Sequence, residues 1–119
     1  MKEITILVVE PGKEPYEKKI EYSSEENISA SLKNLQDIVG GTIEEGCMIT
    51  KDPVAVVVND AGKLLNLPKN RHLPYFGNIP RRSAPDMIHG TFVVIGTTRD
   101  DYGSLTPELV KKYKKVFKL

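Results

Sequence analysis

Cysteine and long apolar runs are both scarce in this sequence. Cys47 is the only cysteine, and no stretch approaches the ~20 apolar residues that a membrane-spanning helix needs. A single cysteine excludes a disulfide within the chain and a zinc site built from cysteines. The first apolar run, Ile4 to Val9, is too short for a secretory signal with its cleavage site. We therefore expect a cytoplasmic protein that makes no contact with a membrane.

An excess of one charge and the common catalytic motifs are also missing. The formal net charge is +1, so any attraction to nucleic acid would need a local basic patch. Neither a G-x-S-x-G motif nor a phosphate-binding G-x-x-x-x-G-K-[ST] loop is present. His72 and His89 have no acid at a ligand spacing, and two histidines alone rarely complete a metal site. We predict that the protein is not an enzyme and holds no metal and no cofactor.

The pattern of apolar residues predicts one domain, covering 1–119. With 39% apolar residues, a chain of 119 residues can build one core. Alternating or β-branched apolar stretches separated by proline and glycine predict strands, and the first two are joined as a hairpin. The predicted strands are Ile4 to Val9, Tyr16 to Tyr22, Thr42 to Ile49, Val54 to Val58, Lys63 to Leu65 and Gly90 to Gly96.

Two segments have the spacing of amphipathic helices. The first carries an apolar stripe up to Val39, begins near Ser29 or at Ser23–Ser24, and ends at Gly40-Gly41. The second begins with Thr106-Pro107-Glu108, a typical helix start, and ends near Phe117. Because strands occur in runs, we predict an α+β fold with a mostly antiparallel sheet of five to six strands and two helices.

An irregular loop, 67–89, interrupts this pattern and is the candidate binding region. Long loops in compact domains are often functional. Its cations outnumber its one acid, Asp86, and guanidinium groups pair with phosphates while aromatic rings stack on bases. The residues predicted to bind a small anionic ligand, such as a nucleotide, are Asn70, Arg71, His72, Tyr75, Phe76, Asn78, Arg81, Arg82 and His89.

Each of these surface features has a purely structural alternative. The same residues are equally compatible with a loop that covers the core, is held there by Leu73 and its other apolar residues, and leaves its arginines solvated. The five lysines of the last helix are typical of a solvated face, because no aromatic residues interleave with them as in a single-strand binder. We expect no nucleic-acid partner, and we leave both readings of the loop open.

Several segments, among them VVEPGKEPYEKKI and DPVAVVVNDAGKLLNLPKNR, resemble the domain of unknown function 3846 family in order along nearly the whole chain. That family consists of small proteins of phages and conjugative elements. Its short acidic stretch between Arg71 and Asp86 is replaced here by the basic HLPYFGNIPRRSAP. The resemblance singles out Glu10, Pro11, Gly12, Tyr16, Gln36, Gly40, Gly41, Asn59, Gly62, Asn70, Arg71, Gly90, Thr91 and Phe92.

The resemblance implies no established activity. A small, non-enzymatic protein of a mobile element, acting in the host cytoplasm, suggests an accessory role against host defence. Our expectation is a non-enzymatic protein that binds an anionic small ligand such as a nucleotide immune signal. The alternative is a protein–protein inhibitor of a host defence nuclease of the CRISPR type, and a nucleic-acid-binding regulator comes third. A homo-oligomer is compatible with each of these roles, since symmetric assembly is common.

Overall fold

A computed structural model of the chain describes residues 2–23, 25–26, 28–46, 48, 50–73, 87–99 and 101–119. Its main sheet consists of β1 (Lys2–Val9), β2 (Tyr16–Tyr22), β3 (Ile43–Glu45), β4 (Val54–Asn59), β7 (Phe92–Thr97) and β8 (Tyr102–Gly103). The strand order is β2-β1-β7-β4-β3, with β8 paired to β7, and every pairing is antiparallel. The predicted α+β class, with a mostly antiparallel sheet of five to six strands and two helices, is confirmed.

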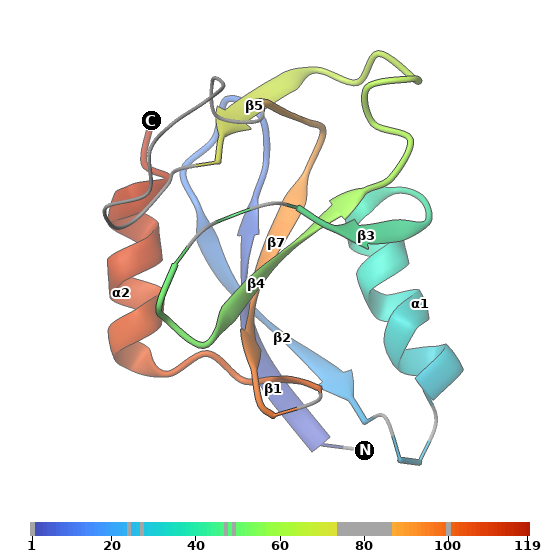
Figure 1. Cartoon of the computed structure of the whole chain (residues 1–119), viewed down its shortest axis with the longest axis vertical. Coiled ribbons are helices and arrows are strands. Elements are labelled where there is room, and N and C mark those ends of the chain that lie inside the picture. The colour runs from blue at the N-terminus through green and yellow to red at the C-terminus, as the bar shows by residue number, and fades with distance from the viewer. Residues whose placement is uncertain are drawn as a thin grey trace.

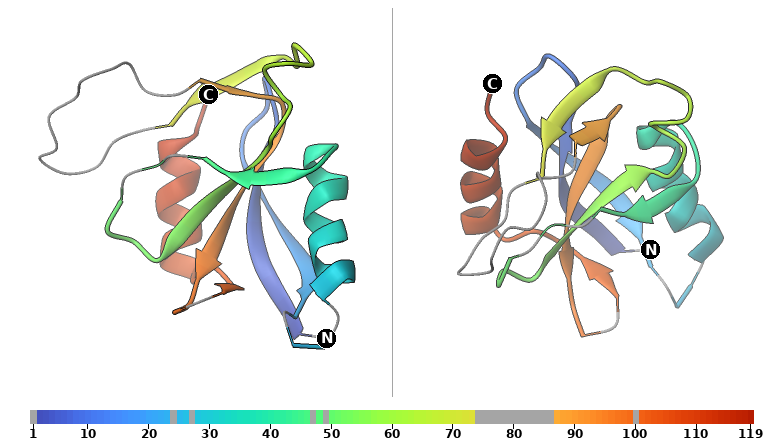
Figure 2. Two further views of the ribbon diagram at one scale, coloured as in Figure 1. Left: turned by 45° about the vertical axis from the view of Figure 1, so that its right-hand side comes forward. Right: turned by 45° about the horizontal axis from the view of Figure 1, so that its top comes forward.

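Two helices cover opposite faces of this sheet (Figure 1). They are α1 (Ile28–Val39) and α2 (Pro107–Val116). Successive residues of a strand point to opposite faces, so Leu7 packs on the α2 side while Val8 packs on the α1 side. Figure 2 shows the same three-layer arrangement from two further directions. The radius of gyration, 13.8 Å, is close to the ~13.5 Å expected for one compact domain of this length.

The predicted helix ends are largely confirmed. Gly40 closes α1 with φ +82°, and its amide donates to the carbonyl of Gln36 at 2.8 Å. The helix begins at Ile28, so Ser29 lies in its first turn rather than before it. Thr106 caps α2 as predicted, because its side chain accepts a hydrogen bond from the Leu109 amide.

One predicted strand, Lys63 to Leu65, is wrong. The segment forms a hydrogen-bonded turn in which the amides of Leu65 and Leu67 donate to the carbonyls of Ala61 and Gly62, at 2.8 and 3.0 Å. The predicted strand Thr42 to Ile49 is shorter, since β3 covers Ile43–Glu45. The predicted strand also includes Cys47, where a free cysteine is usually buried, but this residue lies outside the described part of the chain.

Both ends of the segment predicted as an irregular loop form strands. β5 (Lys69–His72) and β6 (Met87–His89) pair as a separate two-stranded antiparallel sheet. Leu73, directly after β5, is fully buried in the core beneath α2. The core therefore holds the base of this segment, and residues 74–86 lie outside the described part of the chain.

Candidate functional site

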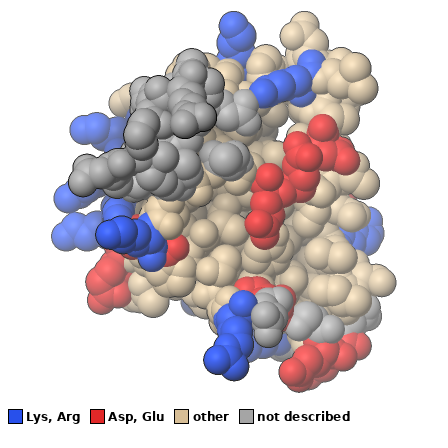
Figure 3. Space-filling view, viewed as in Figure 1, with Lys and Arg blue, Asp and Glu red and all other residues tan. Residues whose placement is uncertain are grey.

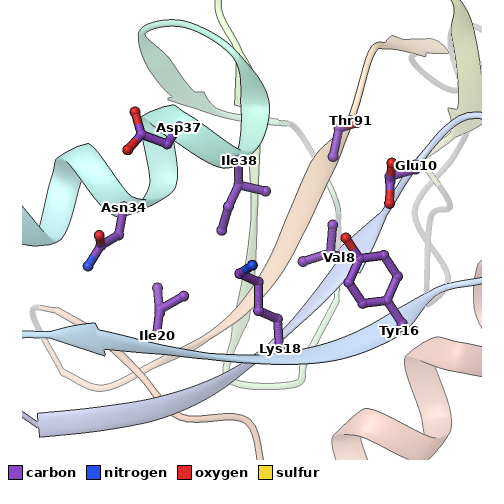
Figure 4. Close-up of a pocket in the computed structure, with 9 residues that line it drawn as sticks. All are labelled: Val8, Glu10, Tyr16, Lys18, Ile20, Asn34, Asp37, Ile38 and Thr91. Carbon is purple, nitrogen blue, oxygen red and sulfur yellow. The ribbon is translucent and has the colours of Figure 1, made fainter.

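A cleft of about 390 Å³ opens between α1 and the hairpin of β1 and β2 (Figure 4). β1, β2 and α1 each contribute to it, together with the short connections before β2 and β7. This volume is within the range of small-molecule sites. The lining residues are Val8, Glu10, Tyr16, Lys18, Ile20, Asn34, Asp37, Ile38 and Thr91.

The floor of the cleft is apolar. Val8 and Ile20 face α1 from neighbouring strands and are 1% and 7% exposed. Ile38 reaches toward them from α1. Side chains of this kind favour the burial of an apolar part of a ligand, at about 25 cal/mol per Å² removed from water.

Glu10 and Tyr16 form one polar end. Figure 4 shows the Tyr16 hydroxyl beside the Glu10 carboxyl group. Burial raises the pKa of the Tyr16 phenol above its usual 10.0, and its hydrogen bond to the negatively charged Glu10 raises that pKa further. Tyr16 therefore keeps its proton at neutral pH. Tyr16 as a residue is 41% exposed, so part of its surface is accessible to a ligand.

The main chain at this end is held by Asn70 and Arg71. The Asn70 side-chain amide donates to the carbonyls of Val9 and Gly90, each at 2.9 Å. Arg71 donates from Nη1 to the Glu10 carbonyl at 2.9 Å and to Asn70 Oδ1 at 2.6 Å. We call this pair the clamp.

Arg71 extends the clamp to two further segments. Its Nη2 donates to the Lys13 carbonyl at 2.6 Å, and its Nε donates to the Phe117 carbonyl at 2.8 Å at the end of α2. Burial lowers the pKa of Arg71, and the nearby negative charge of Glu14 opposes this. The guanidinium donates to three main-chain carbonyls and to the Asn70 side chain, which indicates a structural role, and ligand binding by Asn70 and Arg71 stays a prediction.

The other predicted site residues divide into two groups. His89 lies in β6, where its Nδ1 is 2.9 Å from the Leu67 carbonyl, and His72 is exposed at the end of β5. The remaining five predicted residues lie outside the described part of the chain, and ligand binding by them stays a prediction. They are Tyr75, Phe76, Asn78, Arg81 and Arg82.

The lysine-rich face of α2 carries internal ion pairs. Lys112 Nζ lies 2.6 Å from the Asp52 carboxylate, and Lys114 Nζ lies 3.7 Å from that of Glu17. Figure 3 shows the basic side chains along the α2 side of the molecule interrupted by acidic ones. This mixture favours a solvated face over a surface for nucleic acid.

A second cleft, of about 550 Å³, lies near β8, and the contacts of its tyrosines indicate a structural role. The Tyr22 hydroxyl donates to Asp101 at 3.2 Å, and the Tyr102 hydroxyl donates to Glu45 at 2.5 Å. Burial and these carboxylates raise the pKa of Tyr22 to about 12 and raise that of Tyr102 still further. The two phenols serve as protonated donors that hold the β7–β8 turn against β2 and β3.

The comparisons with known proteins decide the family. A family model described as Domain of unknown function (DUF3846) matches residues 2–118. The chain belongs to the DUF3846 family. Searches of the curated proteins and of the solved structures found no significant match. Among the described residues of this DUF3846 chain, no helix is long and apolar enough to cross a membrane.

Five of the residues that the DUF3846 resemblance singled out lie at or beside the cleft. Glu10, Tyr16 and Thr91 line it, and Asn70 and Arg71 hold the main chain beside it. The hydrophobic and charge patterns did not indicate this site, because its polar residues come from four separate places in the sequence. The resemblance named three lining residues but gave no reason to bring them together.

Proposed function

We propose that this DUF3846 protein is a non-enzymatic accessory protein that captures a small polar ligand in the cleft between α1 and the β1–β2 hairpin. The observation that supports this is the composition of the cleft. An apolar floor, Val8, Ile20 and Ile38, is surrounded by groups that can form hydrogen bonds. Binding sites combine these two features, since the floor supplies affinity and the polar groups fix orientation.

A nucleotide is our first candidate ligand, as the sequence led us to expect. The exposed face of Tyr16 suits stacking on a base, Asn34 offers an amide, and Lys18 is one cation at the cleft. Further cations would have to come from Arg81 and Arg82, which lie in sequence between β5 and β6. A role in the host cytoplasm against nucleotide-based defence follows as part of the proposal.

Thermal shift and calorimetry with a panel of nucleosides and nucleotides test this function. Binding to the folded state alone stabilises it by about 2.7 kcal/mol at a ligand concentration of 100 Kd, which raises the Tm by several degrees. Thr91→Leu should remove binding, because it fills the cleft and deletes a hydroxyl. Thr5→Leu makes the same change at a site lining a different cleft, beneath α2, and should leave binding intact.

Two results would reject the proposal. One is the absence of heat and thermal shift across the whole panel, and the other is equal binding by both threonine variants. If Thr91→Leu binds normally while Arg81→Ala does not bind, the ligand site lies in the 74–86 segment and the cleft is not used.

Inhibition of a host protein is the second candidate, and one observation favours it. Leu64 and Leu65 are 88% and 60% exposed on the hydrogen-bonded turn after β4. A rigid turn that displays two neighbouring apolar side chains suits insertion into an apolar pocket of a protein partner. Replacing both leucines with serine should abolish inhibition of a defence nuclease and leave ligand binding unchanged. The opposite pattern would exclude this role.

A further inference from the structure

The cleft contains more hydrogen-bond acceptors than donors. Glu10 and Asp37 are carboxylates, and Lys18 is the one cation among the lining residues that the structure describes. Lys13 is 4.0 Å from Glu10 and 69% exposed, so it screens that carboxylate only weakly. Lys33 Nζ lies 3.4 Å from the Asp37 carboxylate, in an exposed ion pair on the solvent side of α1. The lining residues therefore carry two negative formal charges and one positive charge.

Asn34 adds another acceptor. Its side-chain nitrogen donates to the Glu21 carbonyl at 2.8 Å, which fixes the orientation of the amide. With the nitrogen directed at β2, Oδ1 can accept a hydrogen bond from a ligand. No hydrogen bond joins the Thr91 hydroxyl to any described residue, so this group can donate or accept.

The position of Glu10 is fixed before any ligand arrives. The clamp holds its carbonyl through Arg71 and holds the preceding residue, Val9, through Asn70. The amide of Lys13 also donates to the Glu10 carbonyl at 3.2 Å, which closes the turn. A main chain held by three donors orients its side chain with little loss of entropy on binding, so the carboxylate is preorganised as an acceptor.

We infer that the cleft recognises hydroxyl or amino groups on a neutral or cationic part of its ligand, and that a phosphate is not bound there, so a nucleotide would enter by its base and sugar and leave its phosphate outside the cleft. This rests on the proposed function and specifies its ligand. A nucleoside or an amino sugar would place donors against Glu10 and Asn34 Oδ1 and its apolar part on the floor. A phosphate at the same place would meet the Glu10 carboxylate with one lysine to compensate.

Matched pairs of probes that differ by one phosphate test this inference. We would titrate ¹⁵N-labelled protein with adenosine and adenosine 5′-monophosphate, and with glucosamine and glucosamine 6-phosphate, up to about 10 mM, because ligands of this size bind weakly. The unphosphorylated member of a pair should shift the amide signals of Lys18, Asn34 and Thr91 and bind about tenfold more tightly than its phosphate.

The variant Glu10→Gln separates charge from shape. It should weaken glucosamine binding about tenfold, since a charge-assisted hydrogen bond is lost. The variant should also reduce the difference in affinity between glucosamine and glucosamine 6-phosphate. Glu44→Gln removes one negative charge from β3, at the opposite edge of the sheet. It should change neither the affinity for glucosamine nor the affinity difference between glucosamine and its phosphate.

The outcomes separate the inference from the function on which it rests. If a phosphorylated probe binds in the cleft as tightly as its partner, the inference fails and the proposed function stands. If no probe moves the cleft signals, both fail. If Glu10→Gln leaves glucosamine affinity unchanged, Glu10 is not the acceptor and the inference fails.

Discussion

Asn70 and Arg71 are neighbours in β5 whose side chains reach main-chain carbonyls of distant segments. Arg71 joins the turn after β1 to the C-terminal end of α2, through bonds of 2.6 to 2.9 Å. A guanidinium can do this because its donors form a planar fork, whereas a lysine ammonium acts as a point charge. These two side chains connect the base of the β5–β6 pair to the rest of the molecule.

Arg71→Lys should therefore destabilise the protein although it keeps the charge. We expect the free energy of unfolding to fall by about 2 kcal/mol, since several hydrogen bonds from a charged donor are lost. Urea denaturation measures this value. Lys69→Ala, an exposed change in the same strand, should cost less than about 0.5 kcal/mol. Equal stability of Arg71→Lys and the unmodified protein would show that the clamp contributes nothing.

Asp52 supplies a pH-dependent part of the stability. Hydrogen bonds from Lys112 at 2.6 Å and from the Tyr113 hydroxyl at 2.8 Å hold the pKa of its carboxyl below the usual 3.8. A carboxyl group whose pKa is lower in the folded state stabilises that state above pH ~4, and this contribution is lost as the pH falls through the folded-state pKa.

Asp52→Asn should lower the free energy of unfolding by about 1 to 2 kcal/mol at pH 7. Below pH ~4 the difference from the unmodified protein should shrink, because the native carboxylate becomes protonated. Guanidinium denaturation at pH 7 and at pH 3 would measure both values. A difference that stays the same at the two pH values would refute the assignment.

Among the elements, those with a strong periodic pattern or a clear cap could be predicted from the sequence. β2 was predicted with its observed bounds, and α2 starts where Thr106-Pro107 indicated. Lys63 to Leu65 was wrong because two adjacent leucines do not distinguish a strand from a turn. β5 and β6 were missed since they have only four and three residues and no apolar alternation, and their pairing with each other is what makes them strands.

The turn after β4 is packed closely against β6. A Cβ atom on Gly62 would lie 2.5 Å from the His89 carbonyl oxygen, so no side chain fits without a backbone shift. Gly62→Ala should cost about 1 to 3 kcal/mol in unfolding free energy, as overpacking does. Its neighbour Lys63 is exposed, and Lys63→Ala should cost less than about 0.5 kcal/mol. Thermal unfolding would compare them, and a neutral Gly62→Ala would contradict the close packing.

Sequence reasoning could find less of the candidate site than of the fold. It identified Arg71 as a cation near an aromatic segment, but a sequence does not show whether a guanidinium meets a ligand or main-chain carbonyls. Glu10, Lys18 and Asn34 form a site only because β2 returns beside β1 and α1 crosses above both. Such convergence depends on tertiary structure, which no local pattern encodes.

The molecule as a whole has two apolar cores that share one sheet. Leu35 belongs to the core under α1, and Val110 belongs to the core under α2. The same central strands contribute alternate residues to both cores, so neither core can open without disturbing the sheet between them.

We therefore expect one cooperative unfolding transition. Leu35→Ala should lower stability by about 3 kcal/mol and Val110→Ala by about 2 kcal/mol. Each variant should shift the transition seen by far-ultraviolet and by near-ultraviolet circular dichroism to the same extent. Two separate transitions in either variant would show that the two faces unfold independently.

The position of β7 has a consequence for synthesis on the ribosome. β7 lies between β1 and β4, yet it follows both in the sequence, and Leu105 donates from its amide to Thr5 at 2.9 Å across a separation of a hundred residues. Until Phe92–Thr97 has emerged, the nascent chain holds two hairpin-containing pieces with unpaired strand edges. Such edges attract other chains, so a chaperone or rapid translation of the last third would protect the newborn protein from aggregation.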